Sequence, residues 1–140
     1  MLSLNLKLWR YPLSQQYRSG LEKQVALQLK KPDYLYEPYR LPYVTYRHYV
    51  PDFVHEKKKI LIECKGFFRA GDIQKYKAIR DSLKDEGWEL VFILSSKKKK
   101  IRKNSKTTME EWCAKEGFLC YTANTLSELH KHIKDKKPCL

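Results

Sequence analysis

The stretch VPDFVHEKKKILIECKG, residues 50–66, constrains the fold more than any other part of the chain. Two β-prone runs flank a lysine-rich break, which predicts an antiparallel hairpin. With the turn centred on that break, Asp52 falls opposite Glu63 on the neighbouring strand. Because strand side chains alternate between the two faces of a sheet, Glu63 and Lys65 share one face. The hairpin therefore brings two acids and one lysine together.

Two interpretations of this group are open. The Glu63 and Lys65 side chains can form an exposed ion pair, worth about 0–1 kcal/mol. Alternatively, cross-strand neighbours have Cβ atoms about 5 Å apart, and two carboxylates placed so close together repel each other unless a cation or a proton joins them. Mg²⁺ binds one or two carboxylates together with water and phosphate oxygens. Asp52, Glu63 and Lys65 would then suit metal-assisted phosphodiester hydrolysis. A slip of one residue in the register would put Asp52 on the other face.

The remaining pattern predicts an α/β fold, with a mixed central sheet flanked by helices and an antiparallel hairpin at its front. Asp72 is predicted to cap the helix that follows the hairpin. One helix is predicted before the hairpin, over residues 19–32. After the hairpin, the predicted order is a helix over 71–87, a strand over 88–94, a helix over 108–116, a strand over 118–122 and a helix over 125–134.

Charge and length narrow the class of protein. A chain of 140 residues is long enough for one domain with its own core. Its net charge of +13 and its pI near 9.6 predict attraction to a polyanion. We expect a cytoplasmic protein with no membrane partner, because no apolar stretch approaches the length of a membrane span and the first residues lack an export signal.

A basic run, KKKKIRKNSK at residues 97–106, holds seven Lys or Arg in ten residues. It is a solvated, disordered loop, a run that resembles a localisation signal but has no function, or a clamp for nucleic-acid phosphates, whose binding would weaken steeply with salt. Cations close in sequence to the acids are further candidates. The predicted DNA-binding residues are Arg18, Arg69, Lys75, Lys97, Lys98, Lys99, Lys100, Arg102 and Lys103.

The pair Pro51-Asp52 followed by Glu63-Cys64-Lys65 resembles the PD-(D/E)XK nuclease motif. The likeness extends along most of the chain to the bacteriophage endonuclease I family. It is carried, in order, by YRSGLEKQV (17–25), YEPYRLPYV (36–44), YVPDF (49–53), IECKG (62–66), VFILSS (91–96) and EEWCAKEGF (110–118).

This resemblance implies a Mg²⁺-dependent DNA endonuclease, with Mn²⁺ as a substitute, that resolves four-way (Holliday) junctions by paired symmetric nicks. It implies the catalytic set Glu22, Asp52, Glu63 and Lys65. Asp52, Glu63 and the backbone carbonyl of Cys64 would bind the metal, with Glu22 as a further candidate ligand. The fold implied is a PD-(D/E)XK, restriction-endonuclease-like core.

The resemblance also implies a tightly intertwined, domain-swapped homodimer, in which Glu22 completes the active site of the partner. The expected organisation is an N-terminal arm over residues 1–16, a single nuclease domain over 17–134 and a tail over 135–140. The resemblance further implies that a segment over about 38–50 bridges the two subunits. The prolines of this segment independently predict edge-strand or bridging structure, because proline cannot donate to the ladder of a central strand.

Alternatives remain at two levels. Ser19 and Glu22 also fit the capping box S-x-x-E, in which the glutamate only caps a helix. The whole chain also fits a PD-(D/E)XK nuclease of other specificity, such as a restriction or transposition-associated enzyme. A third interpretation is a non-catalytic basic DNA- or RNA-binding module.

Overall fold

The computed structural model describes residues 17–29 and 33–138. The chain divides into two compact units, Met1–Arg47 and His48–Leu140. The boundary between them falls inside the segment predicted to bridge two subunits. The predicted N-terminal arm, residues 1–16, and the last two residues of the predicted tail lie outside the described residues.

The first unit contains the helix α1 (Gly20–Gln28). Its N-cap is Ser19, whose hydroxyl accepts a hydrogen bond from the Glu22 amide, and the Glu22 carboxylate accepts one from the Ser19 amide. None of the side chains of α1 is buried, although Leu21 and Val25 are apolar and remain 69% and 44% exposed. Residues 33–47 of this unit form neither helix nor strand.

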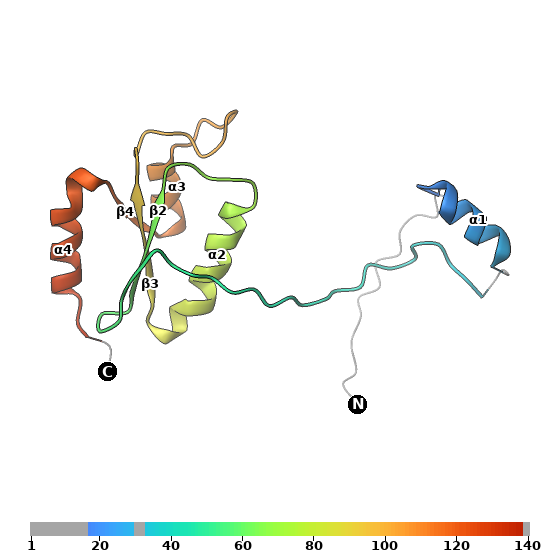
Figure 1. Cartoon of the computed structure of the whole chain (residues 1–140), viewed down its shortest axis with the longest axis horizontal. Coiled ribbons are helices and arrows are strands. Elements are labelled where there is room, and N and C mark those ends of the chain that lie inside the picture. Colours follow the sequence, from blue (N-terminus) through green and yellow to red (C-terminus); the bar gives the residue numbers. More distant parts are fainter. Residues whose placement is uncertain (1–16, 30–32, 139–140) are drawn as a thin grey trace. The chain divides into compact units, whose positions relative to one another are not determined.

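The second unit is built on a four-stranded mixed sheet (Figure 1). The strands follow one another in the order β1 (Phe53–His55), β2 (Ile60–Lys65), β3 (Glu89–Leu94) and β4 (Leu119–Tyr121). The hairpin pair β1–β2 is antiparallel, whereas β2–β3 and β3–β4 are parallel. The predicted α/β fold with a mixed sheet and a hairpin at one edge is therefore confirmed.

Helices cover both faces of this sheet, as Figure 1 shows. The helices α2 (Asp72–Leu83) and α3 (Met109–Glu116) cover one face, and α4 (Leu126–Asp135) covers the other. Short 3₁₀ turns at Lys84–Glu86 and Ala123–Thr125 extend α2 and precede α4. No helix in residues 17–29 and 33–138 is both long and apolar enough to span a membrane.

The prediction that Asp72 caps the second helix was wrong. The N-cap of α2 is Gly71, whose φ of 87° is the left-handed conformation that glycine adopts readily. Asp72 is instead the first helical residue, and its carboxylate is buried. Aspartate is a preferred N-cap residue, which explains why the sequence pattern pointed to a cap. At the first helical position its acidic side chain still suits the positive end of the helix dipole.

Aromatic rings fill the core between the sheet and the helices α2 and α3. The fully buried ring of Phe92 lies 5.1 Å from Tyr76 and 5.2 Å from Phe118, measured between ring centroids, in edge-on contacts. Trp112 stacks on Phe118 at 5.2 Å. Edge-on and stacked ring pairs contribute stabilising free energy beyond that of burying the rings, so this cluster fixes α2 and α3 against the strands.

Replacement of Phe92 by alanine should lower the free energy of unfolding by about 3–5 kcal/mol, because a cavity opens at the centre of the aromatic cluster. The same substitution at Phe67, which is 53% exposed, should cost less than about 1 kcal/mol. Urea denaturation of the two variants would measure both values. Equal losses would contradict this position of the core.

Candidate active site

The hairpin places Asp52 and Glu63 side by side. Phe53 pairs with Ile62 across β1 and β2, which confirms the predicted register. One residue further along, the Asp52 Oδ2 atom accepts a hydrogen bond of 2.7 Å from the Cys64 amide. Asp52 is thus fixed immediately before the first residue of β1, beside the strand that carries Glu63 and Lys65.

Glu63 is only 8% exposed, and both of its carboxylate oxygens are occupied. Oε1 accepts a hydrogen bond of 2.7 Å from the Tyr76 hydroxyl, and Oε2 accepts one of 2.6 Å from the Tyr49 hydroxyl. A buried carboxylate is tolerated only with such partners. Each oxygen has two lone pairs, so both can still bind a second ligand.

Burial and the hydrogen bond to Glu63 raise the pKa of both Tyr49 and Tyr76 far above its usual range. The two phenol groups therefore remain protonated, and act as hydrogen-bond donors, at neutral pH and well above it. Their geometry orients the Glu63 carboxylate. Sequence reasoning missed both tyrosines, because Tyr76 followed the period of a buried helix face and Tyr49 lay in a segment that holds many tyrosines.

Lys65 lies between two carboxylates. Its Nζ atom is 3.7 Å from Glu63 Oε1 and 3.4 Å from Asp72 Oδ2, and its side chain is mostly buried. The same Asp72 oxygen accepts a hydrogen bond of 2.9 Å from the Arg69 amide, which holds the carboxylate in place. The predicted sharing of one face by Glu63 and Lys65 is confirmed, and Asp72 is a further acid that the sequence pattern did not assign to the site.

The donor set at this position suits a hard divalent cation that also keeps water ligands. Among the described residues, no three His, Cys, Asp or Glu side chains are grouped so that they would hold a metal ion on their own. Asp52 is exposed, however, and Glu63 keeps free lone pairs beside it. Two carboxylates with a backbone carbonyl, water and phosphate oxygens match the way in which Mg²⁺ is usually bound.

Glu22 belongs to the first unit and takes part in a capping box, as the alternative interpretation expected. Its Oε2 atom accepts hydrogen bonds from the Arg18 amide (2.7 Å), the Ser19 amide (2.8 Å) and the Tyr36 hydroxyl (3.1 Å). Desolvation acts to raise the pKa of Glu22, but these hydrogen bonds outweigh it and lower the pKa. All three donors contact one oxygen, so a capping role leaves Oε1 available for a ligand.

Comparison with known proteins identifies the family. Residues 8–137 match the Phage endonuclease I family. The chain belongs to this family. It is 39% identical over 108 residues to endodeoxyribonuclease 1 of Enterobacteria phage T3, an alignment that covers 74% of this chain and 69% of the relative. It is 35% identical over 107 residues to endonuclease I of Escherichia phage T7, with coverage of 73% and 70%. The resemblance found in the motifs is thus confirmed.

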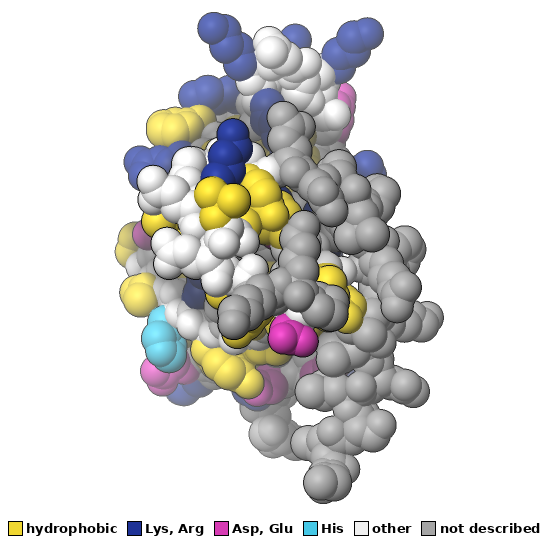
Figure 2. Space-filling view, turned by 90° about the vertical axis from the view of Figure 1, so that its right-hand side faces the viewer, with side chains coloured by type: hydrophobic (Ala, Val, Ile, Leu, Met, Phe, Trp, Pro, Cys, Tyr) yellow, Lys and Arg dark blue, Asp and Glu magenta, His cyan; other side chains and the backbone are white. Residues whose placement is uncertain are grey.

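In this member of the endonuclease I family, the basic loop over residues 97–106 is held by backbone hydrogen bonds. The Lys99 carbonyl accepts a bond of 2.7 Å from the Met109 amide, and the Ile101 amide donates one of 3.0 Å to the Thr107 carbonyl. These contacts argue against a disordered run. Lys and Arg side chains gather at the upper end of Figure 2, the end at which Figure 1 places the loop between β3 and α3.

The predicted DNA-binding residues are divided between the two units. Arg18 is in the first unit, where it forms an ion pair of 2.6 Å with Glu37. Lys75 extends over the rings of Tyr49 and Tyr76, at 5.5 and 5.2 Å from their centroids. Lys97 pairs with Glu110 at 3.6 Å. The other predicted cations are exposed in the second unit: Arg69, Lys98, Lys99, Lys100, Arg102 and Lys103.

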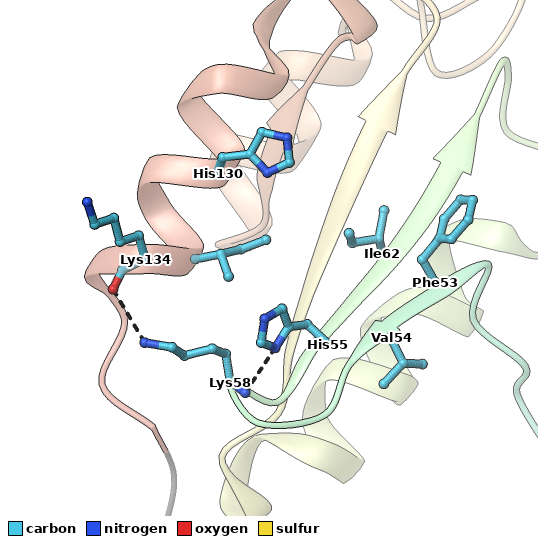
Figure 3. Close-up of a pocket in the computed structure, with 8 residues that line it drawn as sticks. Phe53, Val54, His55, Lys58, Ile62, His130 and Lys134 are labelled. Carbon is cyan, nitrogen blue, oxygen red and sulfur yellow. Dashed lines mark hydrogen bonds between the residues drawn. The ribbon is translucent and has the colours of Figure 1, made fainter.

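An apolar cavity of about 500 Å³ lies between β1 and α4, on the face of the sheet opposite to Glu63 (Figure 3). Phe53, Ile62 and Ile133 contribute most of its apolar lining, and His130 projects toward it from α4. His132, on the same helix, instead contacts Glu89 at 3.1 Å. The cavity is therefore an uncovered part of the sheet face and does not contain the acids.

Replacement of Tyr76 by phenylalanine should lower the free energy of unfolding by about 1.5–3 kcal/mol, because it removes a hydrogen bond to a buried charged group. The matched control is Tyr121→Phe, since the partly buried Tyr121 packs on the other face of the sheet and its hydroxyl donates no hydrogen bond within the described residues. Urea denaturation would measure both. Equal stabilities of the two variants would show that the Tyr76 hydroxyl does not hold Glu63.

Proposed function

We propose that this protein is a Mg²⁺-dependent DNA endonuclease that resolves four-way junctions by paired symmetric nicks. The observation that carries the proposal is the buried Glu63 carboxylate, held beside Asp52 and Lys65 by the hairpin register. Membership of the endonuclease I family supports the same activity, because the T3 relative is named an endodeoxyribonuclease. The proposed core is of the PD-(D/E)XK type.

Asp52, Glu63 and the backbone carbonyl of Cys64 would hold the metal ion, with Glu22 as a further ligand. Mn²⁺ would substitute for Mg²⁺, since both prefer carboxylate and water oxygens. When bound, such an ion lowers the pKa of a coordinated water and neutralises charge on the phosphate. The exposed Asp52 and the remaining lone pairs of Glu63 support this assignment.

The residues of the chain account for the rest of the hydrolysis. A water oxygen bonds to phosphorus while one phosphoester bond breaks, which leaves a phosphate monoester and a free hydroxyl. Lys65 is held by Glu63 and Asp72, so its ammonium group can donate to a phosphate oxygen or orient the water. Tyr49 and Tyr76 keep the Glu63 carboxylate in one orientation throughout. Such positioning is a large part of phosphoryl-transfer catalysis.

A DNA substrate agrees with the charge of the molecule. The net charge of +13 and the ordered basic loop over residues 97–106 suit the phosphate backbone, whose contacts fix orientation without reading sequence. We assign phosphate contacts to the exposed cations near the acids, Arg69 and Lys75 first among them. The activity would take place in the cytoplasm, that of the infected bacterium if a phage encodes the protein.

Two identical active sites would explain paired nicks, and apolar surfaces that the rest of the described residues leave uncovered support a homodimer. In the first unit, Leu21, Val25 and Leu29 line an apolar cavity of about 270 Å³ beside α1. In the second unit, the cavity at Phe53 and Ile62 leaves part of the sheet uncovered. Exposed apolar patches of this kind mark interaction sites. We propose that the subunits exchange their first units, so that Glu22 completes the site of the partner.

A second candidate function is a PD-(D/E)XK nuclease of other specificity, acting on plain duplex. The acids and the basic loop fit it equally well, and only the choice of substrate separates the two. A non-catalytic binding module is less well supported, because it gives no reason for a buried Glu63 carboxylate beside Asp52 in a strongly basic chain.

The variants Asp52→Asn and Glu63→Gln should each reduce junction cleavage by at least about a hundredfold, because each removes a charge from the catalytic group. A labelled four-way junction and a linear duplex of equal length, with Mg²⁺ or with EDTA, provide the assay. Lys131→Gln on α4 is the matched control and should cut at the wild-type rate. Equal cutting of both DNAs would favour the second candidate, and binding without cutting would favour the module.

The exchange of first units predicts complementation between two inactive variants. Homodimers of Glu22→Gln and of Glu63→Gln should both be inactive. Refolded together, they should form mixed dimers with one intact site, which combines Glu22 of one chain with Glu63 of the other. The expected product is a junction with a single nick, detected on denaturing and native gels. A mixture that remains inactive while mixed dimers form would contradict the exchange.

A further inference from the structure

An exposed aromatic ring stands immediately after the strand that carries the acids. Phe67 follows Lys65 by two residues and is 53% exposed, whereas the next residue, Phe68, turns inward and packs at 4.9 Å from Trp112. The two neighbouring phenylalanines thus have opposite environments. Phe68 accounts for the anchoring of this segment in the core, so Phe67 is not needed for that purpose.

The segment that bears Phe67 is fixed at both ends. At its start, the Ser95 amide donates a hydrogen bond of 3.0 Å to the Lys65 carbonyl, and the Ser95 hydroxyl donates one of 3.2 Å to the Gly66 carbonyl. At its end, Asp72 returns to contact Lys65. The backbone that carries Phe67 is therefore held in place, two residues after Lys65.

Two cations from different loops flank this ring. The Arg69 guanidinium lies 5.6 Å and the Lys99 ammonium 5.4 Å from the Phe67 ring centroid. Among the described residues, neither the Arg69 guanidinium nor the Lys99 ammonium forms an ion pair. The nearby Asp72 carboxylate contacts Lys65 and accepts a hydrogen bond from the Arg69 backbone amide. On the other side of Arg69, a cavity of about 480 Å³ is lined by Arg102 and Lys103.

An aromatic ring flanked by two cations that form no ion pair is complementary to a nucleotide, which has an aromatic base and charged phosphates. A base stacks on the ring, and the cations contact the phosphates on either side. In a continuous duplex, however, each base face is covered by its neighbours. An aromatic side chain reaches a base face only where stacking is interrupted, as it is at the point where strands branch.

We propose that Phe67 is a branch-recognition residue, which stacks on a base exposed at the branch point while Arg69 and Lys99 hold the flanking phosphates. The proposal rests on the proposed function and adds to it a physical basis for selecting branched DNA. It separates two tasks among neighbouring residues, since the cations supply affinity for any DNA and the ring discriminates in favour of a branch.

The experiment is equilibrium binding in EDTA, which separates recognition from cleavage, with the full chain and a junction that carries 2-aminopurine beside the branch. Wild-type protein should change the fluorescence of this base on binding. Phe67→Leu keeps an apolar side chain without the aromatic ring, and we expect it to bind the junction about 5- to 30-fold more weakly. Its affinity for a linear duplex should not change. Phe67→Trp should retain the wild-type fluorescence change and affinity.

The cations give the matched comparison. Arg69→Gln and Lys99→Gln should weaken the binding of junction and duplex alike, and each should lower the slope of log affinity against log salt by about 1. Lys131→Gln, on α4 at the opposite face of the sheet, should leave both unchanged.

Unchanged junction affinity and fluorescence in Phe67→Leu would overturn the proposal, and so would an equal loss on junction and duplex. Neither result would affect the proposed nuclease activity. That activity is tested separately by whether the wild-type protein cuts the junction in Mg²⁺.

Discussion

A buried carboxylate imposes the strongest constraint on this structure. Glu63 sits in a sheet of Ile, Leu and Val, where an ionised group is costly unless donors surround it. Two tyrosine hydroxyls and the Lys65 ammonium meet that demand, and they come from the segment before β1, from α2 and from β2 itself. The hairpin, the crossover helix and the strand must therefore all be in place together. The candidate site therefore forms only when the hairpin and α2 have assembled around β2.

This constraint also explains the local departures from an ordinary α/β core. Tyr76 is fully buried in the aromatic cluster, yet its hydroxyl points to Glu63 and links the core to the acids. Asp72 opens α2, where the helix dipole favours a negative charge, and from there it holds Lys65. Gly71 takes over the N-cap because its left-handed backbone lets the chain turn sharply into the helix.

Local patterns predicted much of this arrangement. The lysine-rich break fixed the hairpin register, and alternation then placed Asp52, Glu63 and Lys65 on one face. The central strand and the helices that flank it were also predicted close to their observed bounds. Tyr49, Tyr76 and Asp72 were not assigned to the site because their role depends on contacts across elements, and a tyrosine in an apolar period looks like any core residue. An aspartate at a helix start likewise fits a cap before it suggests an ion pair.

The division of the chain into two units links these observations to recognition. In the first unit, none of the side chains of α1 is buried. Its apolar residues, such as Leu21 and Val25, therefore remain available to pack against another surface. The second unit has its own core and carries most of the candidate site. In the proposed homodimer, exchange with a second copy would stabilise these apolar residues and bring a further carboxylate to each site, and two-fold symmetry would then set the two sites at a fixed separation. Selection of a branched substrate would follow from this geometry for the arms, and from an exposed ring beside each site for the branch point itself.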